Sequence, residues 1–402
     1  MGFFISEIFY LRKIIFPLNH LYSSLIQPMN FLKKLSVFSL FALGFSAQGL
    51  VAQDMSFEEY NPPSTLKVPE NPVKRAKFPF VDIHSHQGGV NEAKIDQLIV
   101  DMNELNMGVM INLSGRGFGQ GNSNTQQDYI KGMLSEFKTH APGRFMVFTN
   151  LNFAGFGLED WSRLAVKELE EDVAAGANGL KIYKSLGFSV KDNNGNRVPV
   201  DHPALDAVWA KAGELGIPVL IHSADPAQFW QPMDSTNERW LELKLNPNRK
   251  RGPSDPAPFE KIISEQHNVF AKHPKTTFIN AHMGWMANDL DAAGAHLDKY
   301  PNVNYEIGAI IAELGRQPRR GKEFFMNYQD RILFGKDAYN KEEYYTYFRV
   351  LETDDEYFPY YKKYHAYWKM YGLGLPDEVL KKVYYKNALR IVPNMDKTLF
   401  PD

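Results

Sequence analysis

The stretch VDIHSH at residues 81–86 decides the fold, because a short apolar run ends there in two histidines. In an extended strand, side chains two residues apart point to the same face. His84 and His86 therefore face one side of the strand, and Val81 and Ile83 face the other. The stretch predicts a strand that carries a pair of imidazoles at its carboxyl end.

Three further stretches also end an apolar run in a polar side chain, namely LIHS at 220–223, INAHMGW at 279–285 and ILFGKD at 332–337. Their polar residues are His222, His282 and Asp337. A single histidine at a strand end is more often a packing or surface residue than a ligand. Five such side chains at the ends of four strands are hard to explain by burial alone, so the sequence predicts one convergent site.

Short apolar runs alternate with helical patterns along most of the chain. The predicted strands are 80–86, 108–114, 145–151, 179–184, 217–222, 276–282, 303–308 and 331–337. The predicted helices include 94–105, 126–139, 160–175, 203–215, 259–272 and 288–299, and Gly108 and Gly216 mark predicted junctions between a helix end and the next strand. This order predicts an α/β protein with a (β/α)₈ TIM barrel, in which catalytic residues come from the carboxyl ends of the strands. An open doubly wound sheet is disfavoured, because the glycine-rich stretch 115–121 lacks the spacing of a phosphate-binding loop.

The composition is that of an ordinary globular protein of 402 residues, with 44% hydrophobic, 13% aromatic and 23% charged residues. The formal net charge is −2, and Lys and Arg are spread along the chain, which argues against a nucleic-acid partner. The chain contains no cysteine, which excludes disulfides and thiolate ligands. A bound metal must therefore use histidine and carboxylate ligands.

The N-terminal part has the pattern of an export signal. Lys33 and Lys34 form a positive region, residues 35–45 an apolar core and residues 50–52 a cleavage site. A membrane anchor is the alternative, but this core is well short of the roughly 20 residues that span a bilayer. We expect an exported protein, periplasmic or secreted, that keeps no stable membrane anchor.

These patterns divide the chain into three parts. They are an upstream extension with a signal peptide at 1–52, a proline-rich linker at 53–77 and a TIM-barrel catalytic domain at 78–402. Met29 lies directly before the signal, so residues 1–28 are expected to precede the true start. Prolines at positions 62, 63, 69 and 72 prevent a long helix or strand in the linker.

In combination, HxH after a first strand, a strand-5 histidine, AHMGW on strand 6 and FGKD on strand 8 resemble the amidohydrolase superfamily. The chain is similar to its amidohydrolase-related branch, which includes metal-dependent hydrolases of cyclic carboxylates and decarboxylases of the aminocarboxymuconate-semialdehyde and hydroxybenzoate types. The similarity covers roughly residues 78–392 and ends with YYKNALRIV, which resembles the closing helix of that family.

The resemblance implies that His84, His86 and His222 bind one divalent cation together with Asp337, and that His282 hydrogen-bonds the substrate or the metal-bound water. Zinc is expected, because three nitrogens and one oxygen suit Zn²⁺ and leave a place for a water whose pKa falls toward about 7. Asp337 would then accept a proton from that water as general base.

One residue departs from the family pattern. Lys336 stands where a serine or threonine usually precedes the final aspartate. A cation beside Asp337 would lower its basicity, unless the lysine side chain points to the helix layer, which strand alternation favours.

Strand 4, within GLKIYKS at 179–185, offers cationic groups. Alternation turns Lys181 and Tyr183 toward the barrel. Lys181 would either bind a substrate carboxylate, which we favour, or be carboxylated and bridge a second metal. Lys184 is a second candidate for binding an anionic substrate. The alternative for both lysines is a solvated loop or a buried ion pair with a partner such as Asp82.

Residues 225–258 form a long connection after strand 5, where catalytic barrels carry lids and substrate walls. Its aromatic residues and Arg239 could enclose a ring that bears an acid group. A contact within a homo-oligomer is the alternative. The tyrosine-rich segment 339–371 either extends this rim or packs as a helix, and we favour packing.

The sequence thus predicts a metal-dependent hydrolase that uses a zinc-activated water on a carboxylate-bearing cyclic amide, lactone or ester. A non-oxidative metal-dependent decarboxylase is the alternative within the enzymes. A catalytically silent periplasmic binding protein is the alternative of another class. The expected partner is an anionic small molecule, and the oligomeric state is open.

Overall fold

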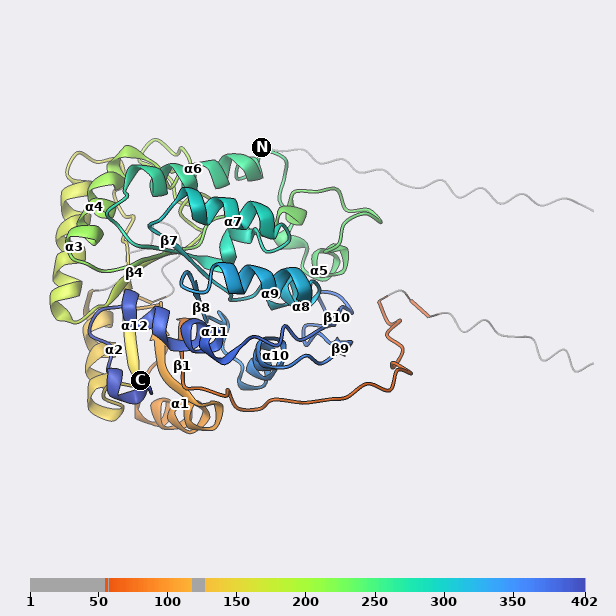
Figure 1. Ribbon diagram of the computed structural model, residues 1–402. Helices are drawn as coiled ribbons and strands as arrows, with labels where there is room; N and C mark the ends of the chain where they lie inside the picture. Colours follow the sequence, from red (N-terminus) through yellow and green to blue (C-terminus); the bar gives the residue numbers. More distant parts are fainter. Residues whose placement is uncertain (1–54, 57, 118–126, 402) are drawn as a thin grey trace, which may run out of the picture. The chain divides into compact units, whose positions relative to one another are not determined.

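Eight parallel strands follow one another around a barrel in the order of the chain (Figure 1). They are β1 (Phe80–Ser85), β2 (Met107–Asn112), β3 (Phe145–Asn150), β4 (Gly179–Ile182), β5 (Val219–Ile221), β6 (Phe278–Asn280), β7 (Val303–Glu306) and β8 (Ile332–Leu333). The predicted TIM barrel is therefore confirmed. Each strand ends earlier than the sequence predicts, and at β1, β5, β6 and β8 the polar residue that ends the predicted strand lies beyond the observed strand.

The computed structural model describes residues 55–56, 58–117 and 127–401. The predicted signal peptide and upstream extension at 1–52 lie outside the described residues, as does part of the glycine-rich stretch 115–121. Residues 57–402 form one unit by their internal contacts, and the barrel lies within it. No helix in the described part of the chain is both long and apolar enough to cross a membrane.

The barrel closes between β8 and β1. The backbone N–H of Ile83 donates to the carbonyl oxygen of Phe334 at 3.1 Å, and that of Asp337 donates to the carbonyl oxygen of His84 at 2.7 Å. Ser85 and Asp337 form an isolated parallel bridge beyond them. This closure places the carboxyl ends of the first and last strands beside each other, which is where three of the predicted ligands emerge.

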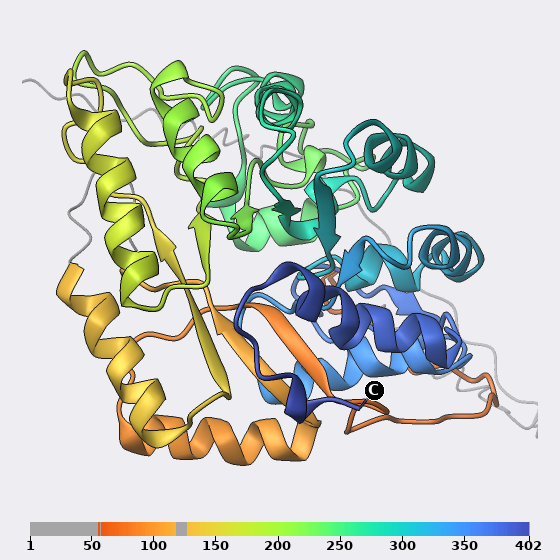
Figure 2. The ribbon, with the colours of Figure 1, turned by 60° about the vertical axis from the view of Figure 1, so that its left-hand side comes forward.

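Helices cover the outside of the strands (Figures 1 and 2). The predicted helices appear as α1 (Glu92–Leu105), α2 (Gln127–His140), α3 (Trp161–Ala175), α4 (Asp206–Glu214), α6 (Phe259–Lys272) and α7 (Leu290–Lys299). The structure adds α5 (Trp240–Leu245), α8 (Ile311–Gly315), α9 (Pro318–Asn327), α10 (Lys341–Glu352), α11 (Asp377–Lys381), a π-helical turn η5 (Lys382–Lys386) and α12 (Asn387–Ile391). A short hairpin pairs β9 (Phe358–Pro359) with β10 (Lys369–Met370).

The ends of α1 show how local chemistry sets helix boundaries. The side chain of Asn91 accepts a hydrogen bond from the backbone N–H of Lys94 at 3.0 Å and caps the first turn. The helix stops at Asn106, whose φ of 69° is left-handed. The predicted junction at Gly108 is thus wrong, because asparagine takes the left-handed position and Gly108 lies inside β2. Gly216, with a φ of 66°, follows α4 as predicted.

An aromatic cluster joins α10 to the barrel closure. The ring of Phe80 on β1 lies 4.8 Å from that of Phe334 and 5.4 Å from that of Phe348 on α10, between ring centroids. All three side chains are fully buried. Helix α10 thus packs against the β1–β8 junction, and this part of the tyrosine-rich segment packs as a helix.

The proline-rich arm lies along the barrel without regular structure. Residues 60–79 contain no helix or strand. Asn71 donates through its backbone N–H and its side-chain amide to Asp355, both at 2.7 Å, and the N–H of Lys77 donates to Glu352 at 3.0 Å. The arm is therefore anchored to α10 and the loop that follows it.

Two neighbouring histidines, the half-buried His267 on α6 and the buried His296 on α7, predict a pH-dependent stability. Burial lowers the pKa of His267 to about 4 and that of His296 to about 3. Unfolded histidine has a pKa of about 6.5, so the unfolded chain takes up protons that the folded chain does not. The stability from these neutral imidazoles is fully present above pH 6.5 and is lost as the pH falls toward 4 and 3.

We therefore expect the free energy of unfolding to fall between pH 7 and pH 5, and His296→Gln to reduce that fall. Urea denaturation at both pH values measures the difference, with His140→Gln at the end of α2 as control. An unchanged pH dependence in His296→Gln would contradict the assignment.

Candidate metal centre

The structure brings five predicted side chains together at the carboxyl ends of β1, β5, β6 and β8. His84 Nε2 and His86 Nε2 lie 3.5 Å and 3.6 Å from Asp337 Oδ1. His282 Nε2 lies 3.4 Å from His222 Nδ1, and the rings of His84 and His282 are 5.1 Å apart. One continuous cluster therefore joins four histidines and a carboxylate.

Three atoms of this cluster have the spacing of metal ligands. One ligand atom from each of His84, His86 and Asp337 lies within 4.8 Å of the ligand atoms of the other two. Ligand atoms at tetrahedral positions around Zn²⁺ are roughly 3.4 Å apart, given bond lengths of about 2.0–2.2 Å. The two observed N···O separations are close to that value, so the three side chains fit a shared cation.

Hydrogen bonds fix which nitrogen of His84 faces the cluster. His84 Nδ1 lies 2.9 Å from Glu306 Oε1, and a carboxylate can only accept, so this nitrogen carries the proton. The lone pair is then on Nε2, which faces Asp337. Two electron-rich atoms that face each other in a buried site favour a cation between them.

A second chain of hydrogen bonds leaves His222 with a free lone pair. His282 Nδ1 lies 2.7 Å from the carbonyl oxygen of Gly308, which can only accept. His282 Nε2 is then the acceptor for His222 Nδ1–H, and the lone pair of His222 lies on Nε2. That atom is buried and has no hydrogen-bond partner among the described residues. His222 is not in either group of side chains with metal-ligand spacing, so among the described residues it joins the cluster through its contact with His282.

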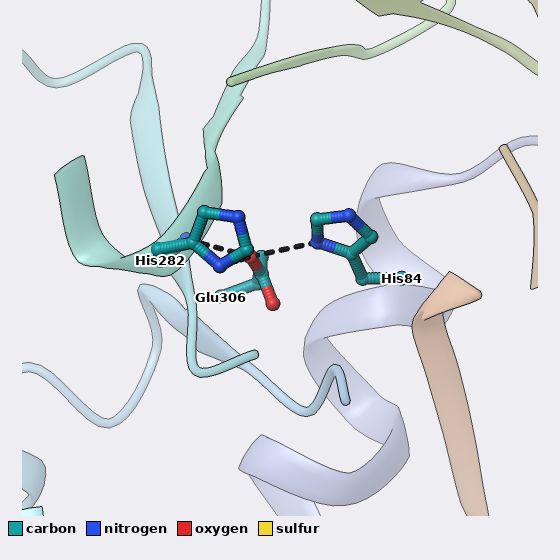
Figure 3. A group of neighbouring side chains, drawn as sticks. All are labelled: His84, His282 and Glu306. Atoms are coloured by element: carbon teal, nitrogen blue, oxygen red, sulfur yellow. Dashed lines mark hydrogen bonds and ion pairs between the residues drawn. The ribbon is translucent and has the colours of Figure 1, made fainter. Parts of the chain in front are cut away.

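Glu306, at the end of β7, is the site residue that the sequence analysis missed (Figure 3). Its oxygens accept from His84 Nδ1 and from the backbone N–H groups of His282 and Gly308, the last two at 2.6 Å. Glu306 could form a group of metal ligands with His84 and His282. Three donors already engage both of its oxygens. We therefore assign Glu306 the role of orienting His84 and His282 and not that of a metal ligand. The available signal was an acidic residue that ends the buried run VNYE.

The protonation states of the cluster suit metal binding. Burial, and then the charge of Lys181, lower the pKa of His86 to about 4, and burial lowers the pKa of His84 and His222 well below the usual value. Burial would raise the pKa of Asp337, but its interactions with His84, His282, His86 and the cation Lys181 lower it below its usual value. At neutral pH the site therefore presents neutral imidazoles at His84, His86 and His222 and an ionised carboxylate at Asp337, the forms that bind cations.

Lys181 reaches the centre of the cluster from β4. Its side chain is buried, and Nζ lies 3.3 Å from His84 Nε2. Burial lowers its pKa to about 8. An ion pair of Lys181 or Lys184 with Asp82 is wrong for this structure, because Asp82 accepts instead from two backbone N–H groups and a tyrosine hydroxyl. The amine of Lys181 thus faces the same nitrogen that would bind a metal.

Lys336 points away from Asp337. Its Nζ pairs with Glu343 and donates to the carbonyl oxygen of Ala338. Glu343 belongs to α10, so the lysine faces the helix layer, as strand alternation favours. The departure from the family pattern at this position thus anchors a helix, and Glu343 neutralises the charge.

The other two predicted cations lie in ion pairs at the rim. Lys184 pairs with Asp225, which also binds Arg251 at 2.5 Å. Arg239 is buried and pairs with Glu242 at 2.8 Å and with Glu313. Arg239 therefore has its charge compensated within the protein, whereas Lys184 and Arg251 share one carboxylate between them.

The turn after β6 is left-handed over four residues. His282, Met283, Gly284 and Trp285 have φ values of 56°, 50°, 60° and 59°. Such a conformation costs about 1–2 kcal/mol for each residue other than glycine. The hydrogen bonds of His282 with Glu306 and Gly308 keep its main chain in this strained conformation. Trp285 stacks on His282 as a result, with ring centroids 4.5 Å apart.

This turn predicts a loss of stability in Gly284→Ala. An added Cβ would lie 2.5 Å from Asn280 Nδ2 and would adopt a left-handed φ. We expect the free energy of unfolding to fall by about 1–3 kcal/mol. Gly132→Ala is the control, because its Cβ meets nothing within 4 Å inside α2, and it should raise stability by about 0.5–1 kcal/mol. Thermal unfolding distinguishes the two, and equal shifts would contradict the strain.

Comparison with known proteins identifies the family of this chain. A family model described as Amidohydrolase matches residues 118–393, which is more than half of the chain. No curated protein matches the chain.

Among solved structures, a dihydroxybenzoic acid decarboxylase from Polaromonas sp. JS666 is 15% identical and has a TM-score of 0.50, over 78% of this chain and 96% of that one. The 2,6-dihydroxybenzoate decarboxylase from Rhizobium is 16% identical with a TM-score of 0.49, over 78% and 98%. Identities this low show the fold alone. The family match shows more, and this chain belongs to the amidohydrolase family and is an enzyme of that superfamily.

Proposed function

We propose that the enzyme is a metal-dependent hydrolase of a carboxylate-bearing cyclic amide, lactone or ester. The observation that carries the proposal is the convergence of His84, His86 and Asp337, whose ligand atoms lie within 4.8 Å of one another. The buried Nε2 of His222, which has no hydrogen-bond partner among the described residues, supports it. These four side chains would hold one divalent cation, which we take to be zinc because the donors are three nitrogens and one oxygen. A second metal would require carboxylation of Lys181.

When bound, the cation supplies Lewis acidity and lowers the pKa of a water molecule toward about 7. Asp337 is ionised and its side chain is 33% exposed, so it can accept the proton of the attacking water. The water oxygen bonds to the substrate carbonyl carbon, the ring C–N or C–O bond breaks, and Asp337 returns the proton to the leaving atom. His282 would accept a hydrogen bond from the attacking water at Nε2, since its 3.4 Å contact with His222 Nδ1 is long enough to be exchanged.

The rim beside His222 supports an anionic substrate. Lys184 and Arg251 bring two positive charges to Asp225, and their cationic groups lie 6.0 Å and 5.0 Å from the ring of Phe188. The surplus charge suits a substrate carboxylate. We assign this contact to Lys184 with Arg251, and a second contact to Lys181. We assign none to Arg239, because Glu242 and Glu313 already bind it.

Non-oxidative decarboxylation at the same centre is the second candidate. It is supported by the similar fold of the Polaromonas decarboxylase, whose structure contains manganese and the inhibitor 2-nitroresorcinol. In that reaction Asp337 and His282 would transfer a proton to the ring carbon from which carbon dioxide leaves. Arg251 and Lys184 would orient the ring acid in either case.

One assay separates the two reactions. The metal-loaded enzyme is incubated with a panel of lactones, cyclic amides and hydroxybenzoates, and released carbon dioxide is measured beside ring opening. Ring opening without carbon dioxide supports the hydrolase, and carbon dioxide release supports the decarboxylase. Metal well below one equivalent per chain, with activity that survives a chelator, would count against both.

We also propose that the protein is exported to the periplasm or secreted. The support is the pattern of Lys33, Lys34 and the apolar residues 35–45. Amino-terminal sequencing of the mature protein tests this proposal, with Gln53 as the expected first residue. A mature protein that retains Met1 would contradict it.

A further inference from the structure

Asp82 bonds to both strands that carry the metal ligands. Its Oδ1 accepts from the backbone N–H of His84 on β1 at 3.0 Å and from the backbone N–H of Lys336 after β8 at 3.1 Å. The pairing of β1 with β2 has an irregularity between Asp82 and Ser85, where the main chain turns to this acceptor. A single carboxylate oxygen therefore joins the two sides of the barrel closure.

The surroundings of Asp82 are unusual for a carboxylate. Its side chain is fully buried, and no Lys, Arg or His in the described ranges forms an ion pair with it. Its other oxygen, Oδ2, accepts from the hydroxyl of Tyr344 on α10 at 2.5 Å. Burial of a carboxylate without a cation is costly, and an apolar residue would pack here without that cost. The contacts of Asp82 thus require an explanation beyond packing.

We propose that Asp82 is a positioning residue of the metal centre. Its carboxylate fixes the two main-chain segments that carry His84 and Asp337, and thereby sets the separation of His84 Nε2 from Asp337 Oδ1. This inference rests on the metal binding in the proposed function, but it does not depend on which reaction follows.

The position of the two amides explains why the effect reaches the ligands. One amide belongs to His84 itself. The other belongs to Lys336, directly before Asp337, whose φ of 82° is left-handed. The N–H of Asp337 also donates to the carbonyl oxygen of His84 at 2.7 Å. A shift at either amide therefore moves a ligand side chain, and metal sites tolerate errors of only about 0.5 Å.

Helix α10 holds the carboxylate in this orientation. Tyr344 binds Oδ2, and the neighbouring Glu343 pairs with the side chain of Lys336. The hydroxyl of Tyr344 fixes the rotation of the carboxylate, so that Oδ1 stays between the two amides. Loss of this hydroxyl should have the same kind of effect as loss of Asp82, but a smaller one.

The test titrates the metal-free full-length protein with Zn²⁺ or Mn²⁺ alone, and measures the dissociation constant together with the melting temperature. We expect Asp82→Ala to weaken metal binding by about 10–100-fold, the usual effect of residues that orient ligands. Tyr344→Phe should weaken it by less. Asp82→Asn keeps an oxygen acceptor for both amides and should restore binding close to that of the unchanged protein.

A matched control separates positioning from general stability. The side chain of Asn302 donates to the carbonyl oxygens of Phe270 and His273, away from the barrel closure. Asn302→Ala should lower the melting temperature and leave the metal dissociation constant unchanged. Equal losses of metal affinity in Asn302→Ala and Asp82→Ala would overturn the proposal.

Two further outcomes also decide the question. If Asp82→Ala folds and binds metal as tightly as the unchanged protein, Asp82 does not position the site. If Asp82→Ala does not fold, Tyr344→Phe decides, and unchanged metal affinity in that variant overturns the proposal. A protein that binds metal but turns over neither lactones, cyclic amides nor hydroxybenzoates would refute the proposed function and leave this inference standing.

Discussion

Asp337→Asn is expected to lower kcat/KM by about 10²–10⁴-fold, the usual contribution of a general acid–base group. Asn has the shape of the carboxylate but can neither accept the proton nor carry the charge that faces His84 and His86. Asparagine also tolerates the left-handed φ of 82° at this position, so the main chain should not change. Steady-state kinetics of the metal-loaded variant measure the loss.

Asp355→Asn is the matched control. Asp355 is a buried carboxylate that binds Asn71 and Arg349, outside the cluster of ligands. This variant should lower the melting temperature and leave kcat unchanged. A rate within threefold of the unchanged enzyme in Asp337→Asn would exclude a general base at this position. If the unchanged protein itself shows no turnover while both variants keep ligand affinity, the chain is a binding protein that retains the site.

The barrel could be predicted from the sequence because its signal is local and repeated. Each predicted strand is a short apolar run, several of which end in polar residues, as in VDIHSH. In each predicted helix the apolar residues recur every three to four positions. The helix end at Leu105 agrees with the predicted range 94–105, but the left-handed residue that ends the helix is Asn106 and not Gly108, since asparagine and glycine can both take that position. The helices α8 to α12 were not predicted individually, because their packing depends on surfaces that form only after the barrel closes.

The ligands could be predicted for the same reason, since His84, His86, His222, His282 and Asp337 all end strands. Hydrogen-bond and ion-pair partners that lie far apart in the sequence could not be predicted. The burial of Arg239 depends on Glu313, 74 residues away in sequence, and no local pattern shows that contact. Glu306 lacks the signature of a histidine motif, and its role is visible only from its three donors in the folded protein.

Because Glu306 has this role, Glu306→Gln is expected to cause large losses of both stability and metal affinity. His84 Nδ1–H and the N–H of His282 both donate to Oε1, and the N–H of Gly308 donates to Oε2. A glutamine side chain has one acceptor oxygen and one NH₂ donor, so at least one buried donor must then face another donor in either orientation. The free energy of unfolding should fall by about 1–3 kcal/mol.

The same substitution should weaken metal binding. A glutamine oxygen at the Oε1 position still accepts from His84 Nδ1, but the neutral amide is a weaker acceptor and its NH₂ then faces the N–H of Gly308, so the imidazole of His84 is held less firmly. Such changes in residues that orient metal ligands usually cost about 10–100-fold in metal affinity. Titration of the metal-free protein with Zn²⁺ measures this loss directly.

Glu265→Gln separates loss of orientation from loss of a buried charge. Glu265 is fully buried on α6 and accepts two hydrogen bonds from Arg197, at 2.9 Å and 2.5 Å. Its substitution leaves the half-buried Arg197 with a neutral partner, so stability should fall, but Glu265 contacts none of the ligands and metal affinity should not change. If both glutamine variants lose stability and neither loses metal affinity, Glu306 serves the fold of the β6–β7 rim and does not orient His84.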